Sequence, residues 1–173
     1  SPESHLEVAK RLQTETKNAH ILDQYANPEN PHAHYAGTAA EIISDLGAVP
    51  DCVVIGAGTG GTITGVAKHF KEKKPDVKIV GVDPVGSILA GGTEVKTYHV
   101  EGIGYDFIPK VLDGSLVDRW IKTEDKPSFE WALRAIREEG LLVGGSSGSV
   151  LYGVEAVISE LKPGATVVAI LAD

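Results

Sequence analysis

The glycine-rich stretch GAGTGGTITG (56–65) constrains the fold most, because it joins an apolar run to a helical pattern. The apolar run DCVVI (51–55) precedes it, and TGVAKHFKEKK (64–74) follows it as far as Pro75. A tight glycine turn from a buried strand into a helix is typical of the carboxyl edge of a parallel sheet. The stretch therefore predicts an α/β fold.

The rest of the chain alternates in the same way. We expect strands at AHILDQY (19–25), DCVVI (51–55), VKIVGVD (77–83), VDRWIKT (117–123), LLVGG (141–145) and ATVVAILAD (165–173). We expect helices at residues 1–16, 38–47, 64–74, 126–140 and 146–161. This alternation predicts a doubly wound α/β fold, with a mainly parallel sheet and helices on both faces.

Turn chemistry sets two boundaries in the first third of the chain. The two Asn-Pro dipeptides in ANPENPHAHYAG (26–37) predict a non-helical loop, because proline disfavours helical backbone in the residue before it. We expect the next helix to begin with Thr38 as its N-cap, with Glu41 completing a capping box. Gly47 should end that helix.

The charge and the residue types exclude several classes of protein. Sixteen Lys and Arg against 24 Asp and Glu leave a net charge of -8, which argues against a nucleic-acid partner. No stretch has the length of a transmembrane helix and no signal peptide is visible, so we expect a cytoplasmic protein without membrane contact.

Neither the cysteine nor the histidines predict a metal site. The single cysteine, Cys52, lies in an apolar strand candidate, which favours a buried core thiol over a nucleophile. The six histidines show no metal-ligand spacing. His32 and His34 would point the same way in an extended segment, and we interpret them as loop or surface residues.

The glycine loop has three interpretations. From Gly56 to Gly61 it matches the dinucleotide pattern G-x-G-x-x-G, and Asp83 lies where a ribose-binding acid would stand. Thr59 and Thr62 add hydroxyls to successive N–H groups, which suits the three terminal oxygens of a phosphate monoester better than a bridging pyrophosphate. A turn that needs glycine only for its dihedral angles would leave the threonines without a role.

The second candidate loop is GGSSGS (144–149), at the start of the last predicted helix. An ordinary N-cap would need only Ser146 or Ser147, and the loop supplies more small and hydroxyl residues than that. A serine that faces a heterocycle nitrogen would leave a pyridine unprotonated, which suits replacement chemistry at a β-carbon. No side-chain general base is apparent, and this favours a cofactor for the difficult step.

The chain resembles fold-type II pyridoxal-phosphate enzymes of the cysteine synthase/cystathionine β-synthase family over nearly its whole length. Four motifs carry the resemblance: GAGTGGTITG (56–65), GVDPVGSIL (81–89), VEGIGYDFIPKVLD (100–113) and EGLLVGGSSGS (139–149). ILDQYANPENPHAHY (21–35) and EGIGYDFIP (101–109) are similar to the cystathionine β-synthase branch, whereas cysteine synthases usually lack YDF.

The resemblance implies pyridoxal 5'-phosphate as cofactor. The residues implied to hold its phosphate are Gly58, Thr59, Gly60, Gly61 and Thr62. Ser146 would face the pyridine nitrogen, and Gly102 and Tyr105, with Glu101 nearby, would lie on the substrate side. For Tyr105 a packing role is equally supported by residue type.

The implied reaction condenses L-serine with L-homocysteine to cystathionine, in an intact enzyme that forms a homodimer or a higher homo-oligomer. Cysteine synthase is the alternative activity within the family, and an NAD-binding Rossmann domain is the alternative outside it.

The lysines depart from the family pattern. The family holds its cofactor as a Schiff base on a lysine in an S-x-K segment, and no lysine of this chain has that context. The resemblance therefore implies that residues 1–173 are one α/β region from the C-terminal part of a catalytic domain, whose lysine and N-terminal subdomain lie outside this chain.

Overall fold

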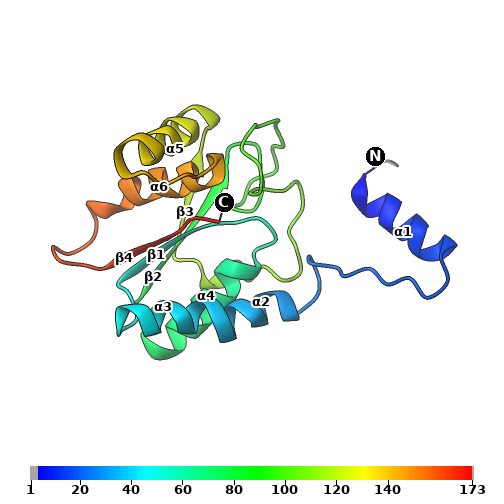
Figure 1. Cartoon of the computed structure of the whole chain (residues 1–173), viewed down its shortest axis with the longest axis horizontal. Coiled ribbons are helices and arrows are strands. Elements are labelled where there is room, and N and C mark those ends of the chain that lie inside the picture. Colours follow the sequence, from blue (N-terminus) through cyan, green and yellow to red (C-terminus); the bar gives the residue numbers. More distant parts are fainter. Residues whose placement is uncertain (1–3, 173) are drawn as a thin grey trace.

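A four-stranded sheet in the order β3-β2-β1-β4 forms the centre of the computed structural model, which describes residues 4–172 (Figure 1). The strands are β1 (Cys52–Gly56), β2 (Lys78–Pro84), β3 (Arg119–Thr123) and β4 (Val167–Ile170). All pairings are parallel, so the carboxyl ends of the strands meet along one edge of the sheet. The glycine-rich loop follows the central strand β1 at that edge.

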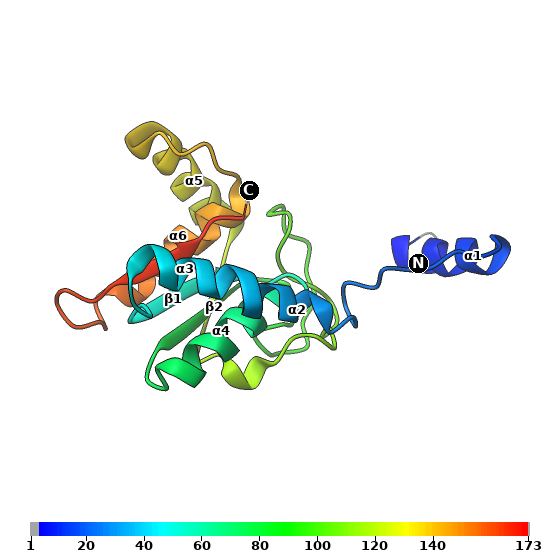
Figure 2. The same ribbon diagram turned by 60° about the horizontal axis from the view of Figure 1, so that its bottom comes forward.

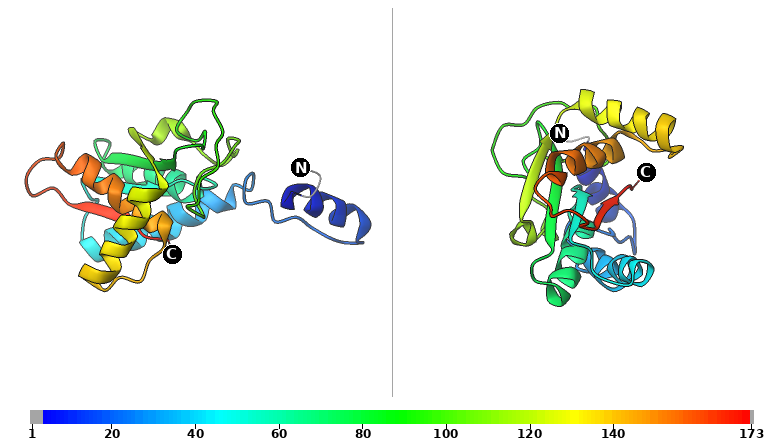
Figure 3. Two further views of the ribbon diagram at one scale, coloured as in Figure 1. Left: turned by 90° about the horizontal axis from the view of Figure 1, so that it is seen from above. Right: turned by 90° about the vertical axis from the view of Figure 1, so that its left-hand side faces the viewer.

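Helices cover both faces of the sheet, which confirms the predicted doubly wound α/β fold. On one face lie α3 (Ala39–Leu46) and α4 (Gly61–Lys73), and on the other lie α5 (Asp125–Glu139) and α6 (Gly145–Ile158) (Figures 1 and 3). None of the helices in residues 4–172 combines the length and the apolar character that crossing a membrane requires.

Two hydrophobic cores form because successive side chains of β1 point to opposite faces of the sheet. Val53 and Ile55 lie in the core under α3 and α4, together with the fully buried Phe70. Cys52 and Val54 lie in the opposite core, beneath α6. The prediction that Cys52 is a buried core thiol is therefore confirmed.

The first helix, α1 (His5–Glu15), lies apart from the sheet at the end of an extended segment (Figures 1 and 2). Its N-cap is Ser4, whose hydroxyl accepts a hydrogen bond from the Glu7 N–H. The helix buries none of its residues, and Leu12 on its apolar face is 52% exposed. The amphipathic pattern in this part of the sequence thus predicts the helix correctly but not its packing.

Two predicted strands, 19–25 and 141–145, are wrong. Both segments lie outside the sheet, and no strand of the described chain pairs with either of them. Leu22 and Leu142 are 89% and 86% exposed, so these apolar runs are not buried as sheet strands would be. A strand needs a neighbouring edge to satisfy its N–H and C=O groups, and the sequence of the segment alone does not show whether one is near.

The predicted non-helical Asn-Pro loop is also wrong, because residues 29–33 form the helix α2 (Glu29–Ala33). Pro28 is its N-cap, and Pro31 lies in its first turn. The N–H groups of a first helical turn have no intrahelical partner, so proline loses no hydrogen bond there. Both prolines are therefore compatible with the helix that they were expected to prevent.

A π-helical turn, η1 (His34–Thr38), joins α2 directly to α3. Thr38 has helical backbone angles and makes no side-chain cap hydrogen bond, so the predicted capping box with Glu41 is wrong. Gly47 ends α3 with a φ of 76°, as predicted. Residues 29–46 consequently form one continuous helical segment along the face of the sheet.

We expect Gly148→Ala to lower the free energy of unfolding by about 1–3 kcal/mol, the usual cost of overpacking. A Cβ at Gly148 would collide with the Ser128 carbonyl oxygen of α5 and lie 2.8 Å from the Ala132 nitrogen. Urea denaturation measures the change. Gly37→Ala is the control, since only the Glu41 side chain comes within 4.0 Å of a Cβ there. Equal stability of both variants would contradict this account of α5–α6 packing.

Cys52 should react very slowly with a thiol reagent in the native protein at pH 8. Burial raises the pKa of its thiol to about 11. The thiolate fraction at pH 8 is then roughly a hundredfold smaller than that of an exposed thiol. Reaction with dithionitrobenzoate, followed at 412 nm in buffer and in concentrated urea, tests this. Fast native reaction would show that Cys52 is accessible.

Candidate functional site

A cavity of about 590 Å³ opens at the carboxyl edge of the sheet. Its volume falls within the range of small-molecule sites, about 300–1,000 Å³. The loop after β1, the irregular segment around residue 102 and the start of α6 border it. All nine residues that the sequence suggests as site residues line this cavity: Gly58, Thr59, Gly60, Gly61, Thr62, Glu101, Gly102, Tyr105 and Ser146.

Each glycine of the loop between β1 and α4 allows another segment to approach. A Cβ at Gly58 would lie 2.7 Å from the Gly102 carbonyl oxygen. A Cβ at Gly60 would lie 2.6 Å from the Leu112 side chain, and Gly60 also has a φ of 85°, which favours glycine. The glycines are therefore required by close packing as well as by the turn.

The Thr59 hydroxyl has its two acceptor positions occupied. Its oxygen accepts hydrogen bonds from Asn30 Nδ2 at 3.1 Å and from the Gly61 N–H at 3.3 Å. The Asn30 amide also donates to the Gln24 carbonyl oxygen at 2.8 Å. Thr59 is thus left to donate its own proton. The sequence analysis missed Asn30 and Gln24, since their proximity to the loop depends on the path of the chain.

Thr62 lies against a histidine that the sequence analysis assigned to an extended loop. Its Oγ1 is 3.2 Å from His34 Nε2, and His34 Nδ1 is 2.9 Å from Thr38 Oγ1. His34 is half-buried, and burial lowers the pKa of its imidazole. The surface interpretation is correct for His32, which is exposed and pairs with Glu29, but not for His34.

The site favours an anion although its lining is not basic. None of the described residues that line the cavity is lysine or arginine. Instead, the N-termini of α4 and α6 both border it, and these helices have 13 and 14 residues. The free N–H groups and the dipole of a helix N-terminus attract negative charge.

Ser146 is a largely buried serine on the cavity wall. Gly144 is the N-cap of α6 and no side chain caps this helix, so Ser146 does not act as the ordinary cap considered from the sequence. Its residue is only 9% exposed, and within residues 4–172 no group forms a hydrogen bond with its hydroxyl. A hydroxyl on a cavity wall is a position where a ligand can form a hydrogen bond.

Tyr105 also lines the cavity, and hydrogen bonds fix its backbone. The Tyr105 N–H donates to Ser87 Oγ at 2.9 Å, and Ser87 Oγ donates to the Tyr105 carbonyl oxygen at 3.1 Å. The Tyr25 hydroxyl donates to the Tyr105 hydroxyl at 3.1 Å, and the two rings meet edge to face. Burial, and then this hydrogen bond, raise the pKa of the Tyr105 phenol. The phenol therefore remains protonated and can donate a hydrogen bond.

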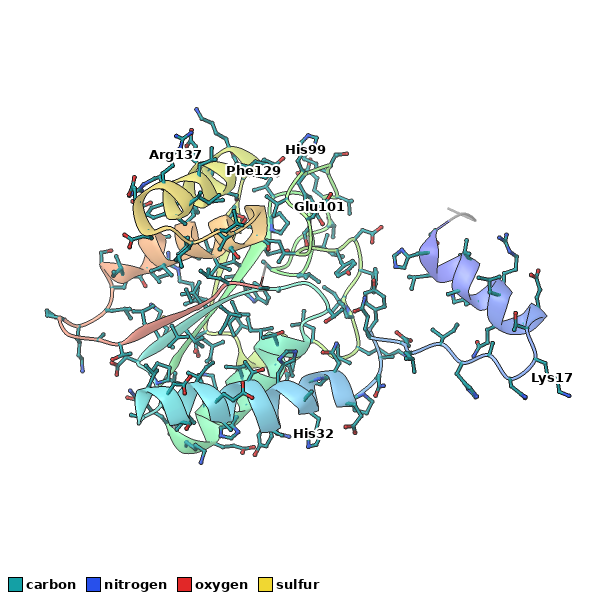
Figure 4. All side chains as sticks on the ribbon, in the orientation of Figure 1. Lys17, His32, His99, Glu101, Phe129 and Arg137 are labelled. Carbon is teal, nitrogen blue, oxygen red and sulfur yellow. The ribbon has the colours of Figure 1, made fainter. Side chains whose placement is uncertain are left out.

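Gly102 and Glu101 lie on the same irregular segment, which rises from the carboxyl edge of the sheet (Figure 4). Gly102 has a φ of 83° and open space where a Cβ would be. The Gly104 N–H donates to the Ala57 carbonyl oxygen at 2.8 Å and so fixes this segment to the glycine loop. Glu101 is exposed at the mouth of the cavity.

Asp83 is not available to bind a ribose. It is fully buried and pairs with Lys122 Nζ at 2.7 Å. The same carboxylate oxygen accepts a hydrogen bond from the Ala90 N–H at 2.9 Å, and Asp83 does not line the cavity. The dinucleotide interpretation therefore lacks the acid that it requires. No cluster of His, Cys, Asp and Glu in the described part of the chain could hold a metal ion.

The whole sequence, residues 1–173, matches the family model described as pyridoxal-phosphate dependent enzyme. It is 55% identical over 177 residues to cystathionine beta-synthase of Dictyostelium discoideum, and 55% identical over 178 residues to that of Rattus norvegicus. Both alignments cover 100% of this chain but only 36% and 32% of those proteins. The chain thus spans about a third of the length of these relatives.

More distant similarity extends to related synthases and to solved structures. A cysteine synthase of Helicobacter pylori is 36% identical over 97% of this chain and 55% of its own. The O-acetylserine dependent cystathionine beta-synthase of Helicobacter pylori has a TM-score of 0.89 at 35% identity, over 96% of this chain and 54% of that one. A hydrogen sulfide-producing enzyme of Fusobacterium nucleatum has a TM-score of 0.92 at 34% identity, over 97% and 57%.

Proposed function

Because the chain belongs to the pyridoxal-phosphate-dependent enzyme family, we propose that its cavity holds that cofactor in a cystathionine β-synthase. The observation that carries the proposal is the convergence of all nine suggested residues on one cavity, with the Ser146 hydroxyl on its wall. In this proposal the cofactor phosphate lies at the start of α4, and its ring extends towards the start of α6.

The phosphate end fits the donors that are present. The proposed ligands are the loop N–H groups together with the hydroxyls of Thr59 and Thr62, and Thr59 is already oriented to donate by Asn30. The dipole of α4 contributes in place of a cationic side chain. A monoester phosphate presents three terminal oxygens to this set, more than either phosphorus of a pyrophosphate offers.

The ring end fits a neutral nitrogen. A hydroxyl at Ser146 donates a hydrogen bond without the charge that a carboxylate would bring, so it leaves a pyridine nitrogen unprotonated. When bound, pyridoxal phosphate supplies an electron-withdrawing ring that stabilises negative charge at the substrate α-carbon. Ser146 sets the strength of that withdrawal through the protonation of the nitrogen.

The substrate wall is assigned to Gly102 and Tyr105, with Glu101 at the entrance. Gly102 leaves room for an amino-acid substrate because no Cβ projects into the cavity, and Tyr105 offers a neutral phenol as donor. The proposed reaction condenses L-serine with L-homocysteine to cystathionine. Tyr105 belongs to the GYDF sequence, and the relatives named cystathionine beta-synthase share 51–55% identity with this chain.

The proposal places the lysine that holds the cofactor in a part of the enzyme outside residues 1–173. The relatives are about three times longer than the segment they share with this chain, which leaves ample sequence for such a subdomain. Activity is accordingly assigned to a protein that contains both regions, and residues 1–173 supply the phosphate, ring-nitrogen and part of the substrate contacts.

The test is an assay of the protein with both regions present, supplied with L-serine and either L-homocysteine or sulfide. Parallel assays supply O-acetylserine with sulfide, or a nicotinamide cofactor. We expect cystathionine from the first pair at a kcat/KM well above that of cysteine formation from the second. A preference for O-acetylserine and sulfide would identify a cysteine synthase instead. A nicotinamide-dependent absorbance change with no cystathionine would support the Rossmann alternative.

We expect Ser146→Ala to lower kcat by roughly 5- to 100-fold, which corresponds to ~1–3 kcal/mol for one lost hydrogen bond, and to change cofactor affinity less. Steady-state kinetics and cofactor titration of the same protein separate the two effects. Ser149→Ala is the control. Its hydroxyl lies 2.7 Å from Ser128 Oγ and outside the cavity lining, so stability should fall and kcat should not. Loss of affinity without loss of kcat would refute the assignment of Ser146.

A further inference from the structure

His34 lies directly behind one of the proposed phosphate ligands. Its Nε2 is 3.2 Å from Thr62 Oγ1, across 28 residues of sequence. Its other ring nitrogen, Nδ1, is 2.9 Å from Thr38 Oγ1, one turn further along the same helical segment. His34 does not line the cavity, so it can act on a bound anion only through Thr62.

The local fold holds His34 at this position. A Cβ at Gly65 of α4 would lie 2.7 Å from the Tyr35 nitrogen and 2.9 Å from His34 Cβ, so the two helical segments are in direct backbone contact. The π-helical turn η1 begins at His34, and the Ala39 N–H bonds to its carbonyl oxygen. Such wider turns are uncommon in helices and are frequent at functional sites.

The imidazole decides in which direction the Thr62 hydroxyl points. Burial lowers the pKa of His34, so the ring is neutral and carries one N–H. If that proton is on Nδ1, Nε2 is an acceptor and the Thr62 hydroxyl donates to it, which turns the oxygen lone pairs of Thr62 towards the cavity. If the proton is on Nε2, Thr62 accepts from His34 and donates its own proton into the cavity.

Thr38 is compatible with the second arrangement, because its hydroxyl can donate to an unprotonated Nδ1 at 2.9 Å as readily as it accepts from a protonated one. Only this arrangement suits an anion at the loop, since a lone pair facing a phosphate oxygen is repulsive. Thr59 is set in the same sense by Asn30 and the Gly61 N–H, so both threonines would present protons.

We propose that His34, protonated at Nε2 and held by Thr38, is a positioning residue that makes Thr62 a hydrogen-bond donor to the phosphate. This inference rests on the proposed function, because it requires a phosphate at the start of α4. It adds a residue outside the cavity to the determinants of phosphate affinity, and it predicts that His34 has no influence on the ring end of the ligand.

The test compares two ligands that differ only in the phosphate, pyridoxine 5'-phosphate and pyridoxine. Neither has an aldehyde, so neither reacts with surface lysines. Dissociation constants are measured by calorimetry for the cofactor-free protein with both regions present and for its His34→Asn and His34→Gln variants. The Asn amide can reach Thr38 but not Thr62, whereas the longer Gln amide can replace the Nε2–H donor.

We expect His34→Asn to weaken pyridoxine 5'-phosphate about five- to tenfold, the effect of one hydrogen bond, and to leave pyridoxine within about twofold. His34→Gln should restore most of the affinity. His32→Asn is the matched control, because His32 lies two residues away with a 64% exposed side chain that pairs with Glu29. It should change neither constant.

A double-mutant cycle with Thr62→Val tests whether the effect of His34 on phosphate affinity depends on the Thr62 hydroxyl. If His34 acts through Thr62, adding His34→Asn to Thr62→Val should cause no further loss. Nitrogen-15 NMR of the unsubstituted chain should show the His34 proton on Nε2, and this measurement does not depend on how well the variants fold.

Three results would overturn the inference: full phosphate affinity in His34→Asn, an equal loss for both ligands, or a proton on Nδ1 in the phosphate-bound chain. Failure of the unsubstituted protein with both regions to bind either ligand would overturn the proposed function itself, and this result is distinct from all three.

Discussion

The rest of the site depends on the glycine turn from β1 into α4, against which other segments pack closely. At three of its glycines, other segments occupy the space that a Cβ would need. These neighbours are the Gly102 carbonyl at Gly58, Leu112 at Gly60 and Asn30 at Gly61. Segments that are distant in the sequence are thereby brought to one strand end. The start of α6 borders the same cavity, although no strand of the described chain leads directly into it.

The proposed anion site has no cationic side chain in its described lining, although the protein is acidic. The chain has a net charge of -8, and the described lining contains no lysine or arginine. The attraction for the anion comes from two helix N-termini and from hydroxyls whose orientation is set by neighbouring side chains. Asn30 orients Thr59, and His34 orients Thr62. Both supporting residues belong to the continuous helical segment 29–46.

Predictions that depend on neighbouring residues agree with the structure, whereas predictions that depend on distant segments do not. The turn GAGTGGTITG predicts its own strand and helix because all the interactions that define it are local. The Asn-Pro segment was wrongly predicted as a non-helical loop. A proline in a first helical turn loses no intrahelical hydrogen bond, and the sequence of the segment does not show that a helix begins there. The apolar run 19–25 was wrongly predicted as a strand, because strand formation depends on a neighbouring strand that lies outside the segment.

The sequence by itself determined the doubly wound α/β fold and the glycine turn after β1, since hydrophobic period and glycine turns are properties of neighbouring residues. The resemblance to a known family, carried by four motifs, supplied the nine residues that line one cavity. Only the tertiary structure decided which groups support those residues. Gln24, Asn30 and His34 reach the glycine loop because α2 and η1 lie against α4 at Gly65. Hydrogen bonds between side chains some 30 residues apart depend on that packing, and no local pattern in the sequence encodes it.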